Sequence, residues 1–209
     1  MQSQLSIEDF FKEKGLDYYP RLIFPDGIEQ KVRKKCRKAL KRGLIDRSLH
    51  WFGFYYAREY EKSLIPKCTI QWMNGWVGYG VFALQDIPRF TYIGEYTGVV
   101  RRRKRLFFRR NDYCFNYEIS YVVRSPFLID AEKGGNFTRF INHSDTPNLE
   151  SIGMFLEGMT HIILRSTRKI VKGEQLTYDY GEDYWKKRND KIRLSVGTET
   201  EQKEPPHRY

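Results

Sequence analysis

Two strings decide how this sequence is read: Arg139-Phe140-Ile141-Asn142-His143-Ser144 and, beyond Pro147-Asn148, Gly173-Glu174-Gln175-Leu176-Thr177-Tyr178-Asp179-Tyr180-Gly181. Because chance matches to a long composite pattern are rare, the two strings in this order restrict the fold more than either does alone. Their tyrosines, taken singly, would be ordinary residues of half-buried strands. The strings around those tyrosines favour a functional site instead.

The two strings resemble the cofactor and catalytic motifs of SET-domain lysine methyltransferases. Two further stretches match this family in the same order: Gly75-Trp76-Val77-Gly78-Tyr79-Gly80-Val81-Phe82-Ala83 and Tyr92-Ile93-Gly94-Glu95-Tyr96-Thr97-Gly98. The first stretch alone would indicate only a hairpin turn, and it is no dinucleotide-binding fingerprint, because strand-like residues follow where that motif needs a helix. The resemblance covers about residues 75–184.

This resemblance implies a mainly β, SET-domain (β-clip) fold, in which the C-terminal segment threads beneath another loop in a pseudoknot-like way that is unusual for proteins. The pattern of the chain agrees with such a fold. From residue 68 onward, short stretches rich in β-branched and aromatic residues alternate with Gly, Pro and Asn. The predicted strands are 68–72, 79–84, 91–100, 113–120, 127–130, 149–156 and 160–166.

An α-helical, basic N-terminal extension precedes the predicted strands. Ser6 with Asp9 forms a capping box, and Gly15 offers a left-handed end to a first short helix. A second helix is predicted over 28–42, with a narrow apolar stripe at four-residue spacing formed by Val32, Cys36 and Leu40. A third starts after Asp46, stops before Pro66 and uses Leu49, Phe52, Tyr56 and Tyr60 as its core face. We therefore expect an extension at 1–67, a SET domain at 68–184 and a polar tail at 185–209.

The balance of charge is strongly basic, with 37 Lys+Arg against 26 Asp+Glu and a net charge of +11. Such a charge favours polyanions over the basic tail that a histone-directed enzyme binds. Much of it lies in two runs, Lys31–Lys38 and Arg101–Arg105. Either run could contact phosphates of DNA or a nucleosome, and the alternatives are a solvated helix face and a solvated loop.

The three cysteines, Cys36, Cys68 and Cys114, are too few and too scattered for a disulfide framework or a zinc site. No metal is expected, and a reducing, intracellular compartment is the better reading. The sequence offers no stretch of about 18 apolar residues, so no membrane span or membrane partner is expected. The oligomeric state stays open, a homodimer included.

Departures from the family pattern indicate a subtype. Asp145 stands where eukaryotic members commonly carry a cysteine after Asn-His-Ser, and no cysteine cluster follows Gly181, so the zinc-bound flanking modules are absent. The sequence most resembles compact bacterial, chlamydial-type SET proteins that are reported as histone-directed effectors. That resemblance implies the host cell nucleus if the protein is secreted, and the bacterial cytoplasm otherwise.

The resemblance implies S-adenosylmethionine as the cofactor. Asn142 and His143 would hold it, largely through backbone groups and the Asn142 side chain. The cofactor-contacting residues that the family pattern implies are Gly78, Tyr79, Gly80, Tyr113, Arg139, Asn142, His143, Tyr180, Tyr184 and Trp185. In this set Tyr184 or Trp185 would cover the adenine, although simple core packing explains that pair equally well.

Three tyrosines are the predicted catalytic residues: Tyr180 beside the reacting methyl, with Tyr178 and Tyr113 lining the lysine channel. Methyl transfer to an amine is an in-line displacement, so the enzyme must align the two partners rather than supply a nucleophile. A lysine with a pKa of about 10.4 must also lose a proton, and an aromatic, desolvated channel beside a sulfonium lowers that pKa.

The predicted activity is methylation of lysine in a histone or histone-like protein. The peptide would add as a strand at an edge formed by residues 115–120 and 127–129. The alternative is a degenerate SET fold that no longer catalyses and serves as a basic DNA- or chromatin-binding module. Retention of Tyr180, Asn142 and His143 argues against that alternative.

Overall fold

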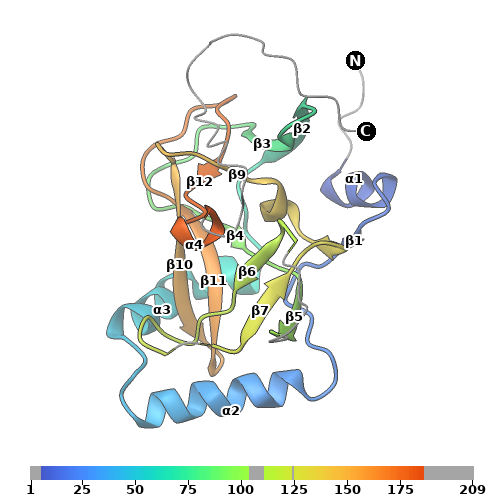
Figure 1. Ribbon diagram of the computed structural model, residues 1–209. Helices are drawn as coiled ribbons and strands as arrows, with labels where there is room; N and C mark the ends of the chain where they lie inside the picture. The colour runs from blue at the N-terminus through green and yellow to red at the C-terminus, as the bar shows by residue number, and fades with distance from the viewer. Residues whose placement is uncertain (1–5, 104–110, 124, 186–209) are drawn as a thin grey trace.

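The computed structural model describes residues 6–103, 111–123 and 125–185 (Figure 1). The helices are α1 (Ile7–Glu13), α2 (Ile28–Lys41), α3 (Arg47–Glu61) and α4 (Glu182–Trp185), with a 3-10 turn, η1, at Phe137–Phe140. The strands are β1 (Asp17–Tyr18), β2 (Cys68–Asn74), β3 (Gly78–Ala83), β4 (Tyr92–Glu95), β5 (Val99–Arg102), β6 (Cys114–Asn116), β7 (Phe127–Asp130), β8 (Gly134–Gly135), β9 (Asn142–His143), β10 (Leu149–Leu156), β11 (Met159–Ser166) and β12 (Thr177–Tyr178).

The described strands form sheets in the orders β4-β11-β10-β12-β9, β5-β7-β6, β2-β3 and β1-β8. Figure 1 shows α2 across one end of the molecule and the β2–β3 hairpin at the opposite end, with the two larger sheets between them. The fold is mainly β with a helical N-terminal part, which confirms the predicted fold class. The predicted domain limits stay predictions, and the tail beyond Trp185 lies outside the described residues.

The N-terminal helices begin and end where the sequence predicts. The Ser6 hydroxyl accepts the backbone N–H of Asp9 at 3.1 Å, and the Asp46 carboxylate accepts that of Ser48 at 2.7 Å. These side chains satisfy backbone donors that a helix N-terminus leaves open. Gly15 follows α1 with φ of +64°, the left-handed conformation that suits the end of a helix.

One position of α2 differs from the prediction. Val32 and Cys36 are buried, but Leu40 is 44% exposed, and Ala39 is the third buried residue. At 3.6 residues per turn, a step of seven residues returns to nearly the same face, whereas a step of eight turns about 80° past it. The predicted stripe at four-residue spacing is therefore wrong at its third member.

Two predicted strands are divided or shortened. The segment 91–100 forms β4, which pairs with β11, and β5, which pairs with β7 in another sheet. Gly98 lies between them, where an added Cβ would stand 2.6 Å from the Asp130 carbonyl oxygen. The segment 113–120 contains only β6 as strand. Tyr117 beyond it still donates its backbone N–H to the Phe127 carbonyl at 3.3 Å.

The C-terminal segment is threaded. β12 lies between β9 and β10 and runs parallel to both, with Tyr178 paired to His143 on one side and to Leu149 on the other. Since residues 144–148 join β9 to β10, the C-terminal segment passes between two strands that a short connection links. The pseudoknot-like arrangement is thereby confirmed, and it places the two diagnostic strings side by side.

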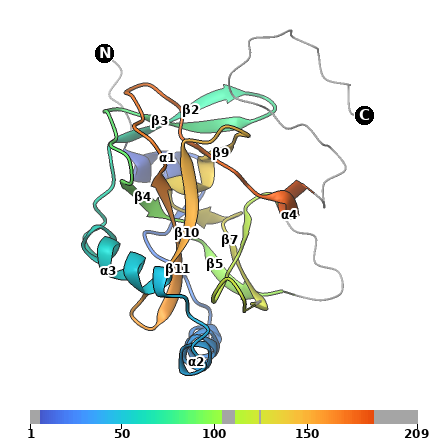
Figure 2. The ribbon, with the colours of Figure 1, turned by 90° about the vertical axis from the view of Figure 1, so that its left-hand side faces the viewer.

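Helix α3 packs against β10 (Figure 2), and at Gly53 no side chain separates the two backbones. A Cβ added to Gly53 would lie 2.0 Å from the carbonyl oxygen of Phe155. Alanine normally stabilises a helix by about 1 kcal/mol over glycine. With alanine at position 53 the helix would have to move away from the sheet. The effect of the substitution on stability is therefore set by the lack of space and not by helix propensity.

We expect Gly53→Ala to destabilise the protein by about 2 kcal/mol, in the range of overpacked cores. Denaturant unfolding measures this. Gly75→Ala is the matched control, because an added Cβ there meets nothing within 4 Å. If the two variants were equally stable, the close approach of α3 to β10 would be wrong.

Candidate active site

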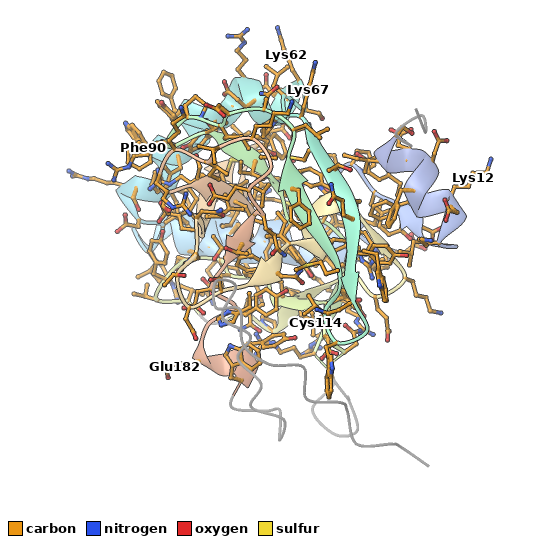
Figure 3. All side chains as sticks on the ribbon, turned by 90° about the horizontal axis from the view of Figure 1, so that it is seen from above. Lys12, Lys62, Lys67, Phe90, Cys114 and Glu182 are labelled. Carbon is orange, nitrogen blue, oxygen red and sulfur yellow. The ribbon has the colours of Figure 1, made fainter. Side chains whose placement is uncertain are left out.

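A row of aromatic rings runs through the junction of β6, β12, β9 and α4. Neighbouring ring centroids lie 4.6 to 6.3 Å apart. In order, the members of this aromatic row are Tyr96, Phe115, Tyr178, Tyr180, Tyr184, Trp185 and His143. Figure 3 labels Cys114 of β6 and Glu182 of α4 at the same side of the molecule, opposite Lys62 and Lys67.

Tyr178 is the most enclosed of the predicted catalytic residues, with 5% of its surface exposed. Its ring stacks on Phe115 at 6.3 Å and lies 4.8 Å from Tyr180. Burial raises the pKa of Tyr178 well above its usual value, and the charge of Tyr96 acts in the same direction. The hydroxyl is therefore neutral near pH 7 and serves as a hydrogen-bonding group rather than a base.

Tyr180 is fixed at both its backbone and its hydroxyl. Its hydroxyl donates to the Ile141 carbonyl at 2.9 Å, and its backbone N–H donates to Nδ1 of His143 at 3.2 Å. Both partners belong to the first diagnostic string. The ring therefore has one orientation relative to β9, as an alignment residue requires.

His143 acts on Tyr180 through its ring nitrogens. Because Nδ1 accepts from Tyr180, the neutral ring carries its proton on Nε2, which lies 3.3 Å from Oδ1 of Asp145. Asp145 stands at the position where this sequence departs from the cysteine that is common in eukaryotic members of the family. In this structure it orients the histidine that positions Tyr180.

The backbone of β3 forms one wall of a second feature, the Gly80 cradle, made of Gly80, Met73, Asn142 and Gln175. A Cβ added to Gly80 would lie 2.6 Å from Met73 Sδ, 2.7 Å from Gln175 Nε2 and 3.2 Å from Asn142 Nδ2. The Asn142 amide donates to the Tyr79 carbonyl at 3.0 Å and lies 3.4 Å from Met73 Sδ. The Gln175 amide donates to the same sulfur at 3.0 Å.

The donors of the Gly80 cradle fit S-adenosylmethionine. A thioether sulfur is a weak acceptor, so the contacts of the Asn142 and Gln175 amides with Met73 satisfy these donors poorly, although the Asn142 amide also donates to the Tyr79 carbonyl. A carboxylate is a far stronger acceptor. The cofactor's amino acid end carries such a carboxylate, and the absence of a side chain at Gly80 lets these two amides lie directly against the β3 backbone.

Trp185 adds a further donor at the end of the aromatic row, beside His143. Its Nε1 is buried and has no hydrogen-bond partner among the described residues. The indole ring lies 4.9 Å from His143 and 4.9 Å from Tyr184. A buried indole N–H usually has a partner, so a ligand that brings an acceptor to this position fits.

Gly78 and Tyr79 support the hairpin next to the cradle. Gly78 has φ of +77° where the β2–β3 hairpin turns. The Tyr79 ring packs edge-on against Phe10 at 5.0 Å and Trp72 at 5.1 Å, so its side chain holds α1 to the hairpin. Only the Tyr79 carbonyl reaches the Gly80 cradle, through Asn142.

Arg139 and Tyr113 form a neighbouring pair. The Arg139 guanidinium donates to the carbonyls of Ala131 at 2.8 Å and Glu132 at 3.2 Å, and it lies 4.0 Å from the centre of the Tyr113 ring. The Tyr113 carbonyl accepts the Tyr96 hydroxyl at 2.9 Å. Arg139 thus positions Tyr113, and the backbone carbonyl of Tyr113 contacts the aromatic row at Tyr96.

The structure brings most of the predicted residues into the two features. Tyr178, Tyr180, His143, Tyr184 and Trp185 lie in the aromatic row, and Gly80 and Asn142 lie in the Gly80 cradle. Gly78, Tyr79, Arg139 and Tyr113 surround them without placing their side chains in either feature. The catalytic and cofactor-binding roles of all these residues stay predictions.

Sequence reasoning missed Tyr96, Gln175 and Met73. Tyr96 and Gln175 lie inside the diagnostic stretches, so their positions carried a signal. Met73 carried none, because its side chain reaches Asn142 only through a register shift between Trp72 and Asn74 in the β2–β3 pairing. A bulge of that kind redirects a side chain and leaves little trace in composition.

Within the described parts of the chain, no group of three or more His, Cys, Asp or Glu side chains is arranged to hold a metal ion. The described helices also include none with the length and apolar character that a membrane crossing needs.

Comparisons with known proteins identify a family and several relatives. Residues 78–181 match the family described as the SET domain. The chain is 39% identical to histone-lysine N-methyltransferase EHMT1 of Mus musculus over 116 residues, which are 52% of this chain and 9% of that protein. It is 36% identical to histone-lysine N-methyltransferase set-2 of Caenorhabditis elegans over 200 residues, or 87% of this chain and 12% of that protein.

A third relative, histone-lysine N-methyltransferase SUV39H2 of Mus musculus, is 34% identical over 122 residues, or 54% of this chain and 25% of that protein. The chain thus spans a quarter or less of the length of these relatives. Among solved structures, ATXR5 in complex with histone H3.1 mono-methylated on R26 superposes with a TM-score of 0.57 at 20% identity, covering 83% of this chain and 85% of that one. The likeness shows a shared fold.

Proposed function

Residues 78–181 form a SET domain and place this chain in the SET-domain family, and on that premise we propose that it is an S-adenosylmethionine-dependent protein-lysine N-methyltransferase that acts on histones or histone-like proteins. One observation carries the proposal. β12 is threaded between β9 and β10, so Tyr178 and Tyr180 of one string stand against Asn142 and His143 of the other.

The residues of the Gly80 cradle would hold the cofactor. The amides of Asn142 and Gln175 would exchange the Met73 sulfur for a carboxylate, and the Trp185 N–H offers a further donor beside His143. S-adenosylmethionine supplies an activated methyl group on a sulfonium. The protein then has to bring a lysine amine into line with that methyl.

The aromatic row would hold the lysine. Tyr180 is fixed by the Ile141 carbonyl and His143, and Tyr178 is held between Phe115 and Tyr180. Tyr178 does not need to ionise, since burial keeps its pKa high. The apolar rings disfavour the charged ammonium, so the lysine enters the reaction as a neutral amine.

The edge of β6 is the proposed docking strand for the substrate. Among the described strands, β6 pairs with β7 on one side only, and its Phe115 stacks on Tyr178. β7 lies between β5 and β6, so the prediction that residues 127–129 supply an edge is wrong. A peptide that adds to β6 through main-chain hydrogen bonds would lead its lysine to the aromatic row.

A histone substrate is supported by the relatives, which are named histone-lysine N-methyltransferases, and by the neighbour's complex with histone H3.1. The degenerate alternative has no support, because the tyrosines and the Asn142–His143 pair are not only present but assembled. The bacterial-effector subtype, its localisation and the oligomeric state stay predictions.

The proposal is tested by incubating the purified protein with labelled S-adenosylmethionine and each core histone in turn. We expect label on at least one histone and none on an unrelated basic protein of similar charge. If a folded protein that binds the cofactor labelled none of the core histones, that result would contradict a histone substrate. Failure to bind the cofactor at all would contradict the proposed methyltransferase activity.

Asn142→Ala should weaken the binding of S-adenosylhomocysteine, which has the same carboxylate, by about 10- to 100-fold, the value of one or two hydrogen bonds to a charged group. Isothermal titration calorimetry measures this. Asn116→Ala is the control. Asn116 lies on β6, where its side-chain oxygen accepts from Arg103, and it is not part of the Gly80 cradle. Wild-type affinity for Asn142→Ala would remove Asn142 from the cofactor site.

Tyr178→Phe should shift the product toward higher methylation states. The family resemblance implies that the residue two positions before the catalytic tyrosine controls how many methyl groups are added. The physical reason is the space available beside the lysine amine. A hydroxyl, with any water it holds, occupies space beside the amine and fixes its orientation. Mass spectra of one peptide at matched turnover measure the shift.

The matched variant for that prediction is Tyr96→Phe, which removes a hydroxyl that donates to the Tyr113 carbonyl. It should leave the product distribution unchanged. A shift with Tyr96→Phe and none with Tyr178→Phe would move the switch to Tyr96.

A further inference from the structure

Two members of each basic run of the sequence meet at one groove. A groove of about 740 Å³ is lined by Lys31, Lys35, Arg102, Arg103, Ser125, Pro126 and Phe127. Its four basic side chains come from two segments separated by more than sixty residues. We call this feature the basic groove. Lys104 and Arg105, which complete the second run, lie outside the described residues.

The packing of α2 explains the convergence. Val32 and Cys36 are buried and dock the helix beside β11 and β5. Lys31 and Lys35 each precede one of these residues, and a spacing of four places them on one side of the helix. Figure 1 shows α2 lying across the ends of β5 and β7, where β5 reaches Arg102.

The described residues that line the basic groove do not balance its charge, because none of them is acidic. The only acid of α2, Glu29, bonds Arg33 at 2.7 Å. The only acid of β7, Asp130, forms an ion pair with Arg101 and accepts from Asn111 at 2.9 Å. Arg103 donates to the side-chain oxygen of Asn116 at 2.8 Å. The acids on these elements are therefore engaged by other residues.

The basic surface continues past the groove along α2. Lys34, Arg37, Lys38 and Lys41 are all exposed on this helix. A helix of 14 residues extends for about 21 Å. Rigidly spaced charges over such a length match a polymer with evenly spaced negative charge, and duplex DNA carries one charge per about 1.7 Å. A short acidic peptide would engage only part of this row.

We infer that the basic groove, with the exposed face of α2, binds the phosphate backbone of duplex DNA at a site separate from the aromatic row. Lysines, arginines and a serine hydroxyl are groups that commonly contact phosphate, and such contacts position a protein without reading sequence. The inference goes beyond the proposed function, since binding here needs neither the cofactor nor the tyrosines. It also accounts for a net charge of +11 in a protein whose proposed substrate is basic.

The test is equilibrium binding to a labelled DNA duplex of arbitrary sequence, without cofactor, over a series of salt concentrations. The groove variant carries Lys31→Gln, Lys35→Gln, Arg102→Gln and Arg103→Gln. The matched control carries Lys12→Gln, Lys62→Gln, Lys67→Gln and Lys172→Gln, exposed lysines outside the groove, three of which Figure 3 labels. Each variant loses four positive charges.

We expect the groove variant to bind DNA about 10- to 100-fold more weakly at about 0.1 M salt. The slope of log affinity against log salt should fall by about 0.9 for each phosphate that the variant no longer neutralises. The control should stay within about threefold of wild type, since its charges lie off the binding surface. Thermal unfolding checks that both variants are folded. A smaller version of the comparison sets the double variant Lys31→Gln/Lys35→Gln against the double variant Lys12→Gln/Lys67→Gln.

Equal weakening of both variants would overturn the inference, because net charge and not the groove would then govern binding. No weakening of either would overturn it too. If polyglutamate displaces the DNA at equal charge concentration and its own binding depends on the same four residues, the groove serves an acidic protein segment instead. None of these readouts depends on methylation, so the inference and the proposed function can fail separately.

Discussion

Tyr180→Phe is expected to lower turnover by about a hundredfold or more, while cofactor affinity stays within about threefold of wild type. The hydroxyl holds the ring against the Ile141 carbonyl, directly before Asn142. Without it, the ring loses the bond that sets its position relative to β9. An interaction that matters for alignment in the transition state affects turnover more than ground-state binding.

Steady-state kinetics on one histone peptide, together with calorimetry of the cofactor, measure both effects. Tyr56→Phe is the matched control. The Tyr56 hydroxyl also donates to a main-chain carbonyl, that of Phe90 at 2.8 Å, but Tyr56 lies on α3 and not in the aromatic row. The control should turn over normally despite a similar loss of stability. An unchanged turnover for Tyr180→Phe would remove Tyr180 from the mechanism.

Asn148→Ala is expected to destabilise the protein by about 3 kcal/mol, because buried backbone groups would lose their partners. Asn148 is 2% exposed. Its amide donates to the Gln175 carbonyl at 2.7 Å and to Glu174 at 2.8 Å, and its oxygen accepts the backbone N–H of Thr177 at 2.9 Å. These bonds fasten the threaded segment immediately before Tyr178.

Denaturant unfolding measures that loss, and hydrogen exchange at Thr177 reports whether the threaded segment opens first. Asn74→Ala is the matched control. Its side chain also accepts two backbone N–H groups, from Trp76 and Val77, but in an exposed hairpin turn where water can replace it. Equal losses for the two variants would show that Asn148 does not fasten the segment.

The features that sequence predicted well are those with a local physical cause. Ser6 and Asp46 cap helices with their own side chains, and β7, β10 and β11 follow the alternation and the turn residues around them. The two diagnostic strings placed Asn142, His143, Tyr178 and Tyr180 together because their order is rare. Local pattern and rare motif therefore gave the fold class and most of the aromatic row.

The features that sequence did not predict depend on contacts between distant residues. β9 and β12 are two residues long, and they exist only because each pairs with a distant segment. The Met73 sulfur reaches Asn142 through an irregular hairpin, and β7 becomes a central strand only when β5 and β6 flank it. The basic groove is a further case, since no local pattern joins Lys31 to Arg102.

The position of the transferred methyl group tests the central claim most directly. Tandem mass spectrometry of a core histone, treated with the protein and S-adenosylmethionine, locates that group on a residue. We predict methylation on the Nζ of lysine, dependent on the cofactor and reduced about a hundredfold or more in Tyr180→Phe. Methylation on another residue type, or equal methylation of lysine by wild type and Tyr180→Phe, would contradict the account.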